Sequence, residues 1–180
     1  YEKTILIEEF VNGCTLEYKL SQRKLCIEEL IGIMLQLFAV VEHLHALTPP
    51  VIHRDIKPDN ILIDKGYVVL IDFEIAKLMT TRKDILRTGS VGYAAPEQYY
   101  GLSDEQSDIY SMGILLKELC YCTAWQNVEQ FVFQDIIRRS TVRQQEKRYL
   151  KVSQMRNDFL IECYKCKTLA KYAESIPTKR

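Results

Sequence analysis

Four polar residues stand at spacings that could support the transfer of a phosphoryl group. Asp55 and Lys57 lie in the stretch VIHRDIKPDN, which ends at Asn60, and Asp72 lies in the stretch IDFEIAK. A carboxylate such as Asp55 can orient an attacking hydroxyl and take its proton, and Lys57 can neutralise the moving group. Asn60 and Asp72 offer an amide oxygen and a carboxylate, which suit a magnesium ion that also holds phosphates.

A predicted β-hairpin brings the two metal-binding candidates together. Two short apolar runs, residues 61–63 and 67–71, are joined by Asp64-Lys65-Gly66, where glycine permits a positive φ. Folding back at this turn makes Asn60, before the first run, a neighbour of Asp72, after the second. The sequence therefore predicts a hard-oxygen metal site at the open end of the hairpin.

Hydrophobic periodicity predicts that the rest of the chain is mainly α-helical within an α+β fold. The strongest helix is Ile27–Leu47, where apolar residues recur at helical spacing until Thr48-Pro49-Pro50 stops it. A short helical segment is expected before it. The other predicted elements are a strand at Thr4–Val11 that ends at Asn12-Gly13, a long loop at Thr80–Tyr93, and helices at Glu105–Tyr121, Glu129–Arg139 and Val152–Tyr172, the last with breaks that the pattern does not locate.

The composition is that of one ordinary globular domain. Of 180 residues, 47% are hydrophobic, and 24 lysines and arginines balance 24 acidic residues, so no overall field attracts nucleic acid or an anionic membrane. The longest apolar run, Leu30–Val41, is too short to cross a bilayer, and we expect no membrane segment and no signal peptide.

Two of the cysteine pairs could in principle hold zinc. They are Cys120-x-Cys122 and Cys163-x-x-Cys166, in helix-like sequence without the turn residues of a zinc knuckle. We therefore interpret them as reduced thiols and expect a cytoplasmic protein.

Three motifs, in matching order and spacing, resemble those of the eukaryotic-like (Hanks-type) serine/threonine protein kinases. They are HRDxKPxN at residues 53–60, DFE at residues 72–74 and APE at residues 95–97, and the style of GSVGYAAPEQY is closer to bacterial members. The resemblance implies a protein kinase-like fold, with a large C-terminal lobe and a small β-hairpin catalytic region. It also implies that the chain divides into three parts. Residues 1–17 would be a remnant of the small lobe with its last strand and the hinge, residues 18–172 the C-terminal lobe, and residues 173–180 a polar tail.

The resemblance also implies the reaction and the residues that carry it. The γ-phosphate of ATP, bound with Mg²⁺ or alternatively Mn²⁺, would pass to a serine or threonine hydroxyl of a protein substrate. Asp55 would be the base, Lys57 the charge stabiliser in contact with ATP, and Asn60 and Asp72 the metal ligands. Leu62 would pack beneath adenine, and Glu9 and Val11 would form the hinge. Lysine at position 57 is the serine/threonine-kinase choice.

Other motif residues are expected to hold the fold. By resemblance, His53 and Phe73 belong to an internal hydrophobic spine, and Asp108 in SDIYSMG anchors the backbone of the catalytic loop. Glu97 is expected to form a buried ion pair with Arg148 of EKRY, and removal of one partner would leave a buried charge unpaired.

Residues 72–97 resemble an activation segment. Arg54 would be the arginine that clamps a phosphorylated residue of this segment. The candidate phosphorylation sites are Thr80, Thr81 and Thr88. Ser90 matches the position that contacts Asp55 and Lys57 from the substrate-facing loop.

Three features depart from the family pattern. The chain opens at Tyr1 in a strand-like run, without a glycine-rich loop or a phosphate-pairing lysine, so we expect a fragment that needs its N-terminal lobe in cis. Glu8 falls at the gatekeeper position, where a buried carboxylate would need a partner. Glu74 replaces a glycine and would be strained by about 1–2 kcal/mol if a left-handed conformation were required.

Three functions remain after these departures. The leading one is a protein kinase whose partner is a protein substrate, with no nucleic acid bound. The alternative is a pseudokinase or truncated scaffold that binds proteins. A small-molecule phosphotransferase shares the base and metal residues but is disfavoured, because GYAAPEQY resembles a peptide-docking segment.

Overall fold

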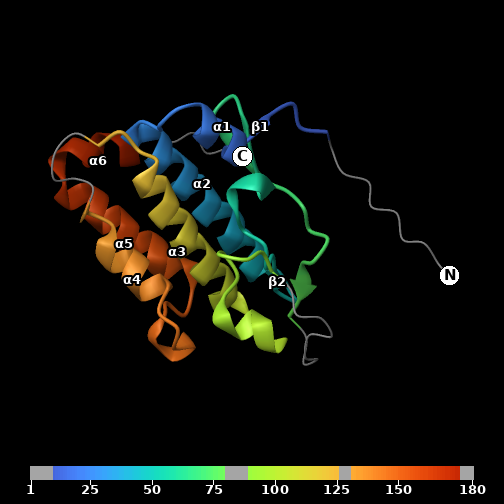
Figure 1. The fold of residues 1–180 in the computed structure, drawn as a ribbon. Helices are drawn as coiled ribbons and strands as arrows, with labels where there is room; N and C mark the ends of the chain where they lie inside the picture. The colour runs from blue at the N-terminus through green and yellow to red at the C-terminus, as the bar shows by residue number, and fades with distance from the viewer. Residues whose placement is uncertain (1–9, 80–88, 126–130, 175–180) are drawn as a thin grey trace.

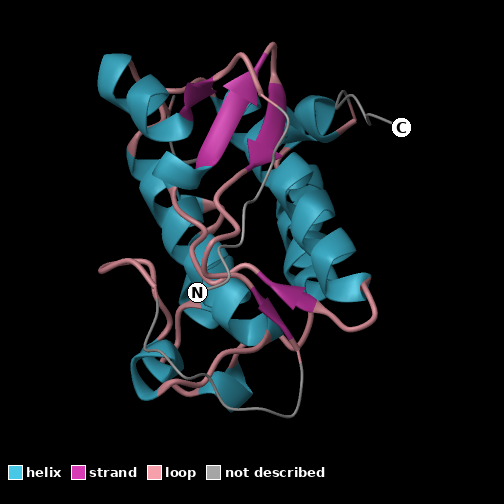
Figure 2. Cartoon of the chain, turned by 90° about the vertical axis from the view of Figure 1, so that its right-hand side faces the viewer, coloured by secondary structure: helices cyan, strands magenta, loops and turns pink. Residues whose placement is uncertain are grey.

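The computed structural model is an assembly of helices with two small antiparallel sheets (Figures 1 and 2). It describes residues 10–79, 89–125 and 131–174. The α-helices of this part are α1 (Leu16–Gln22), α2 (Ile27–Ala46), α3 (Glu105–Tyr121), α4 (Gln134–Ser140), α5 (Val152–Lys165) and α6 (Lys167–Ala173). Short 3-10 helices are η1 (Pro58–Asn60), η2 (Pro96–Tyr100) and η4 (Gln145–Lys147). The predicted fold class, α+β and mainly α-helical, is confirmed.

Helix α2 runs through the centre of the core. Its observed end, Ala46, lies one residue before the predicted end. The apolar stripe that predicted it is buried except for Leu44 near its end, which is half-buried. Phe38 on this stripe meets Phe159 of α5 edge-to-face, with ring centroids 5.5 Å apart. Phe159 stacks in turn on Phe133, at 4.4 Å between centroids. The helical period therefore located both the helix and its buried face.

The other predicted helices are right in type, and two of the three differ from the prediction in their ends. Helix α3 has the predicted bounds. Helix α4 begins at Gln134 and not at the predicted Glu129; the buried Phe133 stands at the N-cap position with φ −97° and ψ 8° and makes no side-chain capping bond. Residues 129 and 130 lie outside the described part. The predicted helix Val152–Tyr172 divides at Cys166, whose extended backbone separates α5 from α6.

Helices α3 and α4 approach each other closely at Gly113. A Cβ atom on this glycine would lie 2.1 Å from the Oγ atom of Ser140, far inside contact distance. Glycine is therefore required here by the packing of the two helices.

The predicted hairpin is formed by β3 (Ile61–Asp64) and β4 (Tyr67–Leu70), with Ile61 opposite Leu70. Lys65 and Gly66 both have positive φ, 50° and 88°, as the two central residues of a tight hairpin turn require. A two-residue strand, β1 (Cys14–Thr15), pairs with β3 and was not predicted. Of the predicted strand Thr4–Val11, residues 4–9 lie outside the described part, and residues 10 and 11 form no strand.

A second sheet pairs β2 (Val51–Ile52) with β5 (Lys77–Leu78). Figure 2 shows the three-stranded sheet at the top of the view and the two-stranded sheet below its middle, with loops between them. The segment 53–57 follows β2 and leads through η1 to β3, so it crosses the space between the sheets. The candidate catalytic loop is therefore fixed at one end by β2 and at the other by β3.

The six cysteines are thiols outside disulfide bonds; Cys14 and Cys26 are exposed, and burial raises the pKa of Cys120 and Cys163 to about 12. Within the described residues, histidine, cysteine and acidic side chains nowhere gather in threes as a metal cluster. No helix described here combines the length and apolarity that a membrane crossing needs.

Candidate active site

Asp55 lies at the centre of a hydrogen-bonded group of side chains. Its carboxylate is 7% exposed and accepts hydrogen bonds from the side-chain amide of Asn60, at 2.9 Å, and from the backbone N–H of Ser90, at 3.2 Å. The ammonium of Lys57 lies 2.9 Å from the same carboxylate and 2.6 Å from the Ser90 hydroxyl. Loop 53–60 and the segment near residue 90 are therefore joined at Asp55, and the predicted contacts of Ser90 are present.

These hydrogen bonds set the charge state of Asp55. Burial raises the pKa of this carboxyl, but hydrogen bonds from Ser90, Lys57 and Asn60 outweigh burial, so the pKa lies below its usual range. Asp55 is consequently ionised at neutral pH. Such a group can accept a hydrogen bond from a hydroxyl and hold that hydroxyl in a chosen direction.

The hairpin places Asn60 beside the strand end that leads to Asp72. The backbone N–H of Ile71 donates to the carbonyl of Asn60, at 2.9 Å, one step beyond the last strand pair. Because the Asn60 amide nitrogen already bonds Asp55, the orientation of the side chain leaves its amide oxygen as the free acceptor. Asp72 is exposed and adds a carboxylate. This donor set consists of hard oxygens and fits Mg²⁺.

Glu74 does not adopt the left-handed conformation on which the expected strain depended. Among the described non-glycine residues, positive φ occurs at Arg54, Lys65 and Asp72, so Glu74 does not take the left-handed conformation. Asp72 has φ 65°, and its Oδ1 atom accepts the N–H of Glu74, at 3.3 Å. The left-handed step lies two residues earlier, at an aspartate, which tolerates it better than most residues. Glu74 is exposed.

His53 and Phe73 pack against each other, as predicted. Their ring centroids lie 4.8 Å apart in an edge-to-face arrangement, and the His53 Nε2 atom lies 3.1 Å from the carbonyl oxygen of Ile71. Burial lowers the pKa of His53, although the nearby Asp108 opposes the shift. A neutral, buried imidazole of this kind is a packing residue that joins the catalytic loop to the hairpin end.

Asp108 anchors the backbone of the catalytic loop. It is fully buried, and its two oxygens accept the backbone N–H groups of His53, at 2.9 Å, and Arg54, at 2.8 Å. The guanidinium of Arg54 donates to the carbonyl of Ile75, inside the segment that the resemblance identifies as the activation segment. The anchoring contact is the predicted one, whereas clamping of a phosphorylated residue by Arg54 stays a prediction.

Glu97 and Arg148 form the predicted ion pair. Two guanidinium nitrogens of Arg148 lie 2.6 and 2.9 Å from the two carboxylate oxygens of Glu97. Arg148 is 2% exposed and also donates to the carbonyl of Val142, at 2.8 Å. The pair joins η2 to the segment after η4.

The remaining candidates are not brought to Asp55 by the structure. Leu62 is half-buried in β3, opposite Val69 and Thr15. Val11 is half-buried and precedes β1. Candidates that lie outside the described residues are Glu8, Glu9, Thr80, Thr81 and Thr88.

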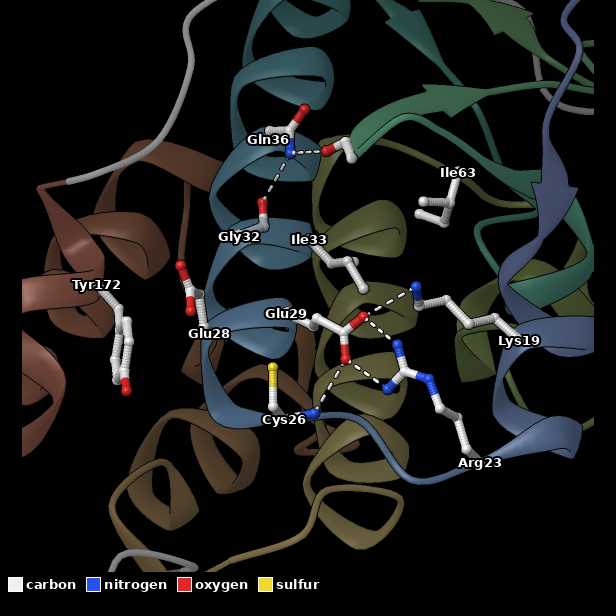
Figure 3. A pocket seen from close by; sticks show the side chains of 11 residues that line it. Lys19, Arg23, Cys26, Glu28, Glu29, Gly32, Ile33, Gln36, Ile63 and Tyr172 are labelled. Carbon is white, nitrogen blue, oxygen red and sulfur yellow. Dashed lines mark hydrogen bonds and ion pairs between the residues drawn. The ribbon is translucent and has the colours of Figure 1, made fainter.

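A pocket of about 520 Å³ lies apart from these side chains, between α1, α2, the hairpin turn and Tyr172 (Figure 3). Neither Asp55, Lys57, Asn60 nor Asp72 lines it. On its wall the side-chain amide of Gln36 donates to the carbonyl of Gly66, at 2.9 Å, and the Gln36 oxygen accepts the N–H of Val68, at 3.1 Å. Gln36 thus supports the hairpin from α2, and the pocket is separate from the four side chains of the candidate site.

Sequence reasoning missed two residues that support the catalytic loop. Gln98 donates to the carbonyl of Arg54, at 2.9 Å, and accepts the N–H of Ala95, at 2.8 Å. His45, in the last turn of α2, lies 2.9 Å from Asp108. Gln98 directly follows the APE motif, which was a usable signal, whereas the helical pattern around His45 gave none.

Comparison with known proteins identifies the family. The family model described as protein kinase domain matches residues 1–171. Relatives include the probable serine/threonine-protein kinase WNK6 of rice, 35% identical over 66% of this chain and 27% of its own length. The serine/threonine-protein kinase PrkC of Bacillus subtilis is 41% identical over 63% of this chain and 18% of its own length. The LRR receptor-like serine/threonine-protein kinase GSO2 of Arabidopsis thaliana is 37% identical over 64% of this chain.

The family model matches nearly all of this chain, whereas the chain matches only a small part of each relative. The chain spans between about a tenth and about a quarter of the length of these relatives, which are 10%, 18% and 27% covered. The family model, in contrast, covers almost the whole chain, including each motif around Asp55. This chain belongs to the protein kinase domain family.

Proposed function

We propose that the chain carries the catalytic loop of a serine/threonine protein kinase, which transfers the γ-phosphate of ATP to a serine or threonine hydroxyl of a protein. The observation that carries the proposal is the contact group of Asp55 with Lys57, Asn60 and Ser90. The base, the cation and the amide that the reaction needs are all present in one hydrogen-bonded unit.

Asp55 is the residue that handles the substrate hydroxyl. Its ionised carboxylate accepts the hydroxyl hydrogen bond, aims the oxygen at the γ-phosphorus atom, and takes the proton as the new oxygen–phosphorus bond forms and the bond from that phosphorus to the bridging oxygen breaks, releasing ADP. Lys57 lies 2.9 Å from Asp55 and offers its remaining hydrogens to the transferred group. Ser90 holds both side chains at this spacing.

Asn60 and Asp72 are the proposed ligands of Mg²⁺. Bound there, the ion would neutralise charge on the phosphate oxygens. Asn60 has a second task, because its amide nitrogen donates both to the carboxylate and to the backbone carbonyl of Asp55, at 2.9 Å each. One side chain thus links the metal position to the base.

The whole protein is proposed to complete the site with a small lobe in cis. Support comes from the limited share of the relatives' lengths that the chain spans. Within that lobe and hinge, Glu9 and Val11 are proposed to hold adenine together with Leu62. Thr80, Thr81 and Thr88 are proposed as phosphorylation sites that Arg54 would clamp. We propose a cytoplasmic location.

The test is an autophosphorylation assay on the full-length protein with radiolabelled ATP and Mg²⁺. Wild type is expected to incorporate label that Asp55→Asn does not, and peptide mapping is expected to find label at Thr80, Thr81 or Thr88. Equal incorporation by both proteins would refute the role of Asp55, and no incorporation by either would favour a protein-binding scaffold. Label at other positions alone would remove the activation-segment proposal.

A further inference from the structure

A pocket of about 340 Å³ begins close to the candidate active site. It is lined by Gly92, Ala94, Pro96, Tyr99, Tyr100, Tyr110 and Arg143. Its near edge is continuous with Ser90, whose backbone N–H donates to Asp55 and whose hydroxyl accepts from Lys57. Gly92 stands two residues after Ser90, and two residues of chain span at most about 7 Å. A protein segment whose hydroxyl is held by Asp55 therefore reaches the pocket with a neighbouring side chain.

The backbone at this edge forms a tight turn beside open space. The N–H groups of Tyr93 and Ala94 both donate to the carbonyl of Ser90, at 3.1 and 2.9 Å. Gly92, inside the turn, has φ 94°, and a Cβ atom built on it would meet no atom within 4 Å. The turn is thus held by hydrogen bonds, and the space next to Gly92 is left for a ligand.

Large apolar side chains around the pocket are exposed to solvent. Within the twelve-residue segment 91–102, the exposed ones are Val91, Tyr99, Tyr100 and Leu102, and Val91 and Tyr100 are 91% and 80% exposed. Exposed apolar side chains that gather in one place mark an interaction surface, and tyrosine is enriched in the contacts between proteins. Because this surface adjoins Asp55, the protein substrate is the partner that it fits.

Arg143 gives the pocket a positive charge. It is the one charged residue among the described residues that line the pocket, and its side chain is exposed. Its guanidinium has no ion-pair partner within the described part of the chain. A guanidinium presents paired N–H donors that match a carboxylate or a phosphate, and tyrosine hydroxyls can donate as well. The pocket is therefore complementary to an anion.

The buried ion pair of Glu97 and Arg148 holds the wall of this pocket in place. The carbonyl of Arg143 accepts a hydrogen bond from the Arg148 guanidinium, at 3.2 Å. The same guanidinium lies over the ring of Tyr110, at 4.8 Å, and is fixed by Glu97. The backbone of Arg143 and the ring of Tyr110 are thus positioned before any ligand binds, which lowers the entropy cost of binding.

We propose that this pocket binds an anionic side chain of the protein substrate, close in sequence to the serine or threonine that accepts the phosphate, and that Arg143 selects it. The inference rests on the proposed phosphotransferase function and names its substrate class. Aspartate, glutamate and a phosphorylated serine or threonine share the required chemistry. Arg143 contacts the substrate away from the reacting atoms, so it acts on KM more than on kcat.

A peptide series assayed with the full-length protein tests the selection. Each peptide carries one serine in a neutral sequence and one aspartate, placed in turn at every position within about five residues of the serine. We expect aspartate at one or two adjacent positions to raise kcat/KM about tenfold over the neutral peptide, mainly through KM. The same kcat/KM for all peptides would overturn the proposal. Phosphoserine at the preferred position identifies the source of the anion: a further gain above about threefold assigns a phosphorylated side chain, and no gain assigns an acidic one.

Charge variants of Arg143 connect the preference to this residue. Arg143→Gln is expected to reduce the preference for aspartate over the neutral peptide to less than about twofold, and Arg143→Lys to retain part of it. Arg143→Glu is expected to reverse it, so that lysine at the same position is preferred over aspartate by about tenfold. Arg138→Gln is the matched control, because Arg138 is exposed, pairs with Asp135 at 3.0 Å and does not line the pocket. An undiminished preference in Arg143→Gln, or an equal loss in Arg138→Gln, would contradict the assignment.

Equilibrium binding gives a readout that does not depend on activity. Fluorescein-labelled peptides with alanine in place of the serine are titrated with the full-length protein, and anisotropy reports their affinity. Wild type is expected to bind the acidic peptide about tenfold more tightly than the neutral one, and Arg143→Gln to bind both alike. Equal affinities for wild type, or no measurable binding of either peptide, would overturn the proposal. If wild type transferred no more phosphate than Asp55→Asn, the proposed function would fail while the binding result still decided the role of the pocket.

Discussion

The two acidic residues of the DFE motif, Asp72 and Glu74, differ in backbone conformation. Asp72 has φ 65° and Glu74 lies outside the left-handed region, so the residue that departs from the family glycine is not the strained one. A carboxylate at position 74 is exposed and compatible with the fold.

This difference predicts opposite responses to glycine. Glu74→Gly is expected to lower the free energy of unfolding by about 0.5–1 kcal/mol, because glycine gains freedom in the unfolded chain. Asp72→Gly is expected to be more stable than Glu74→Gly by about 1 kcal/mol, because it relieves a left-handed conformation. Urea unfolding of both variants measures this. A Glu74→Gly protein more stable than wild type would show that glutamate is strained there.

Single residues of the site were predictable because their motifs fix both type and spacing. Asp55, Lys57 and Ser90 are in contact, as their motif positions predicted. The position of Asn60 beside the strand end that leads to Asp72 was predicted from the hairpin. Strain at Glu74 was expected only for a left-handed conformation, and the sequence could not tell whether position 74 takes one, because residue type only biases φ. His45 was missed because its role depends on a contact 63 positions away in sequence.

At the scale of elements, two helix glycines have different reasons to be present. Gly113 stands where α3 meets α4, and a Cβ atom there would lie 2.1 Å from Ser140 Oγ. Gly32 of α2 faces open space, with nothing within 4 Å of such an atom, and it lines the pocket of Figure 3. One glycine is required by packing, and the other is not.

The two glycines form a matched test of helix packing. Gly113→Ala is expected to lower the free energy of unfolding by about 1–3 kcal/mol, because the helices must separate. Gly32→Ala is expected to raise it by about 0.5–1 kcal/mol, because alanine is the better helix former. Thermal unfolding of both variants, and of Gly113→Ala with Ser140→Gly, measures this. Equal effects at the two positions would contradict the packing assigned to α3 and α4.

Element types were predictable from periodicity, and element ends were less so. Helix α2 and the β3–β4 hairpin follow from patterns that repeat over their whole length. The start of α4 coincides with Phe133, which stacks on Phe159, and the break between α5 and α6 lies at one extended residue, Cys166. Neither single position stands out in a periodic pattern. The two-residue strands β1, β2 and β5 are too short for any period to appear.

At the scale of the whole molecule, one ion pair joins the end of the activation-like segment to the helical body. Glu97 and Arg148 are 51 positions apart, and the Arg148 side chain has no exposed surface. The guanidinium also lies over the Tyr110 ring, at 4.8 Å. Such a pair holds two distant segments in register more than it adds net stability.

Breaking this pair is expected to destabilise the protein strongly. Arg148→Met should lower the free energy of unfolding by about 3–5 kcal/mol, because Glu97 is left as an unpaired, largely buried carboxylate. The exposed pair of Arg138 with Asp135 is the control, and Arg138→Met should change stability by less than about 0.5 kcal/mol. Denaturant unfolding compares them, and similar losses from both would refute the distinction.

The distribution of thiols makes this chain suited to site-selective labelling. Cys14, beside the hairpin, and Cys26, at the first turn of α2, are exposed, whereas Cys120 and Cys163 have thiols whose pKa burial raises to about 12. A maleimide dye added at neutral pH should therefore react first at the two exposed positions. A fluorophore at either one would report on the hairpin side of the molecule without an engineered cysteine and far in sequence from the catalytic loop.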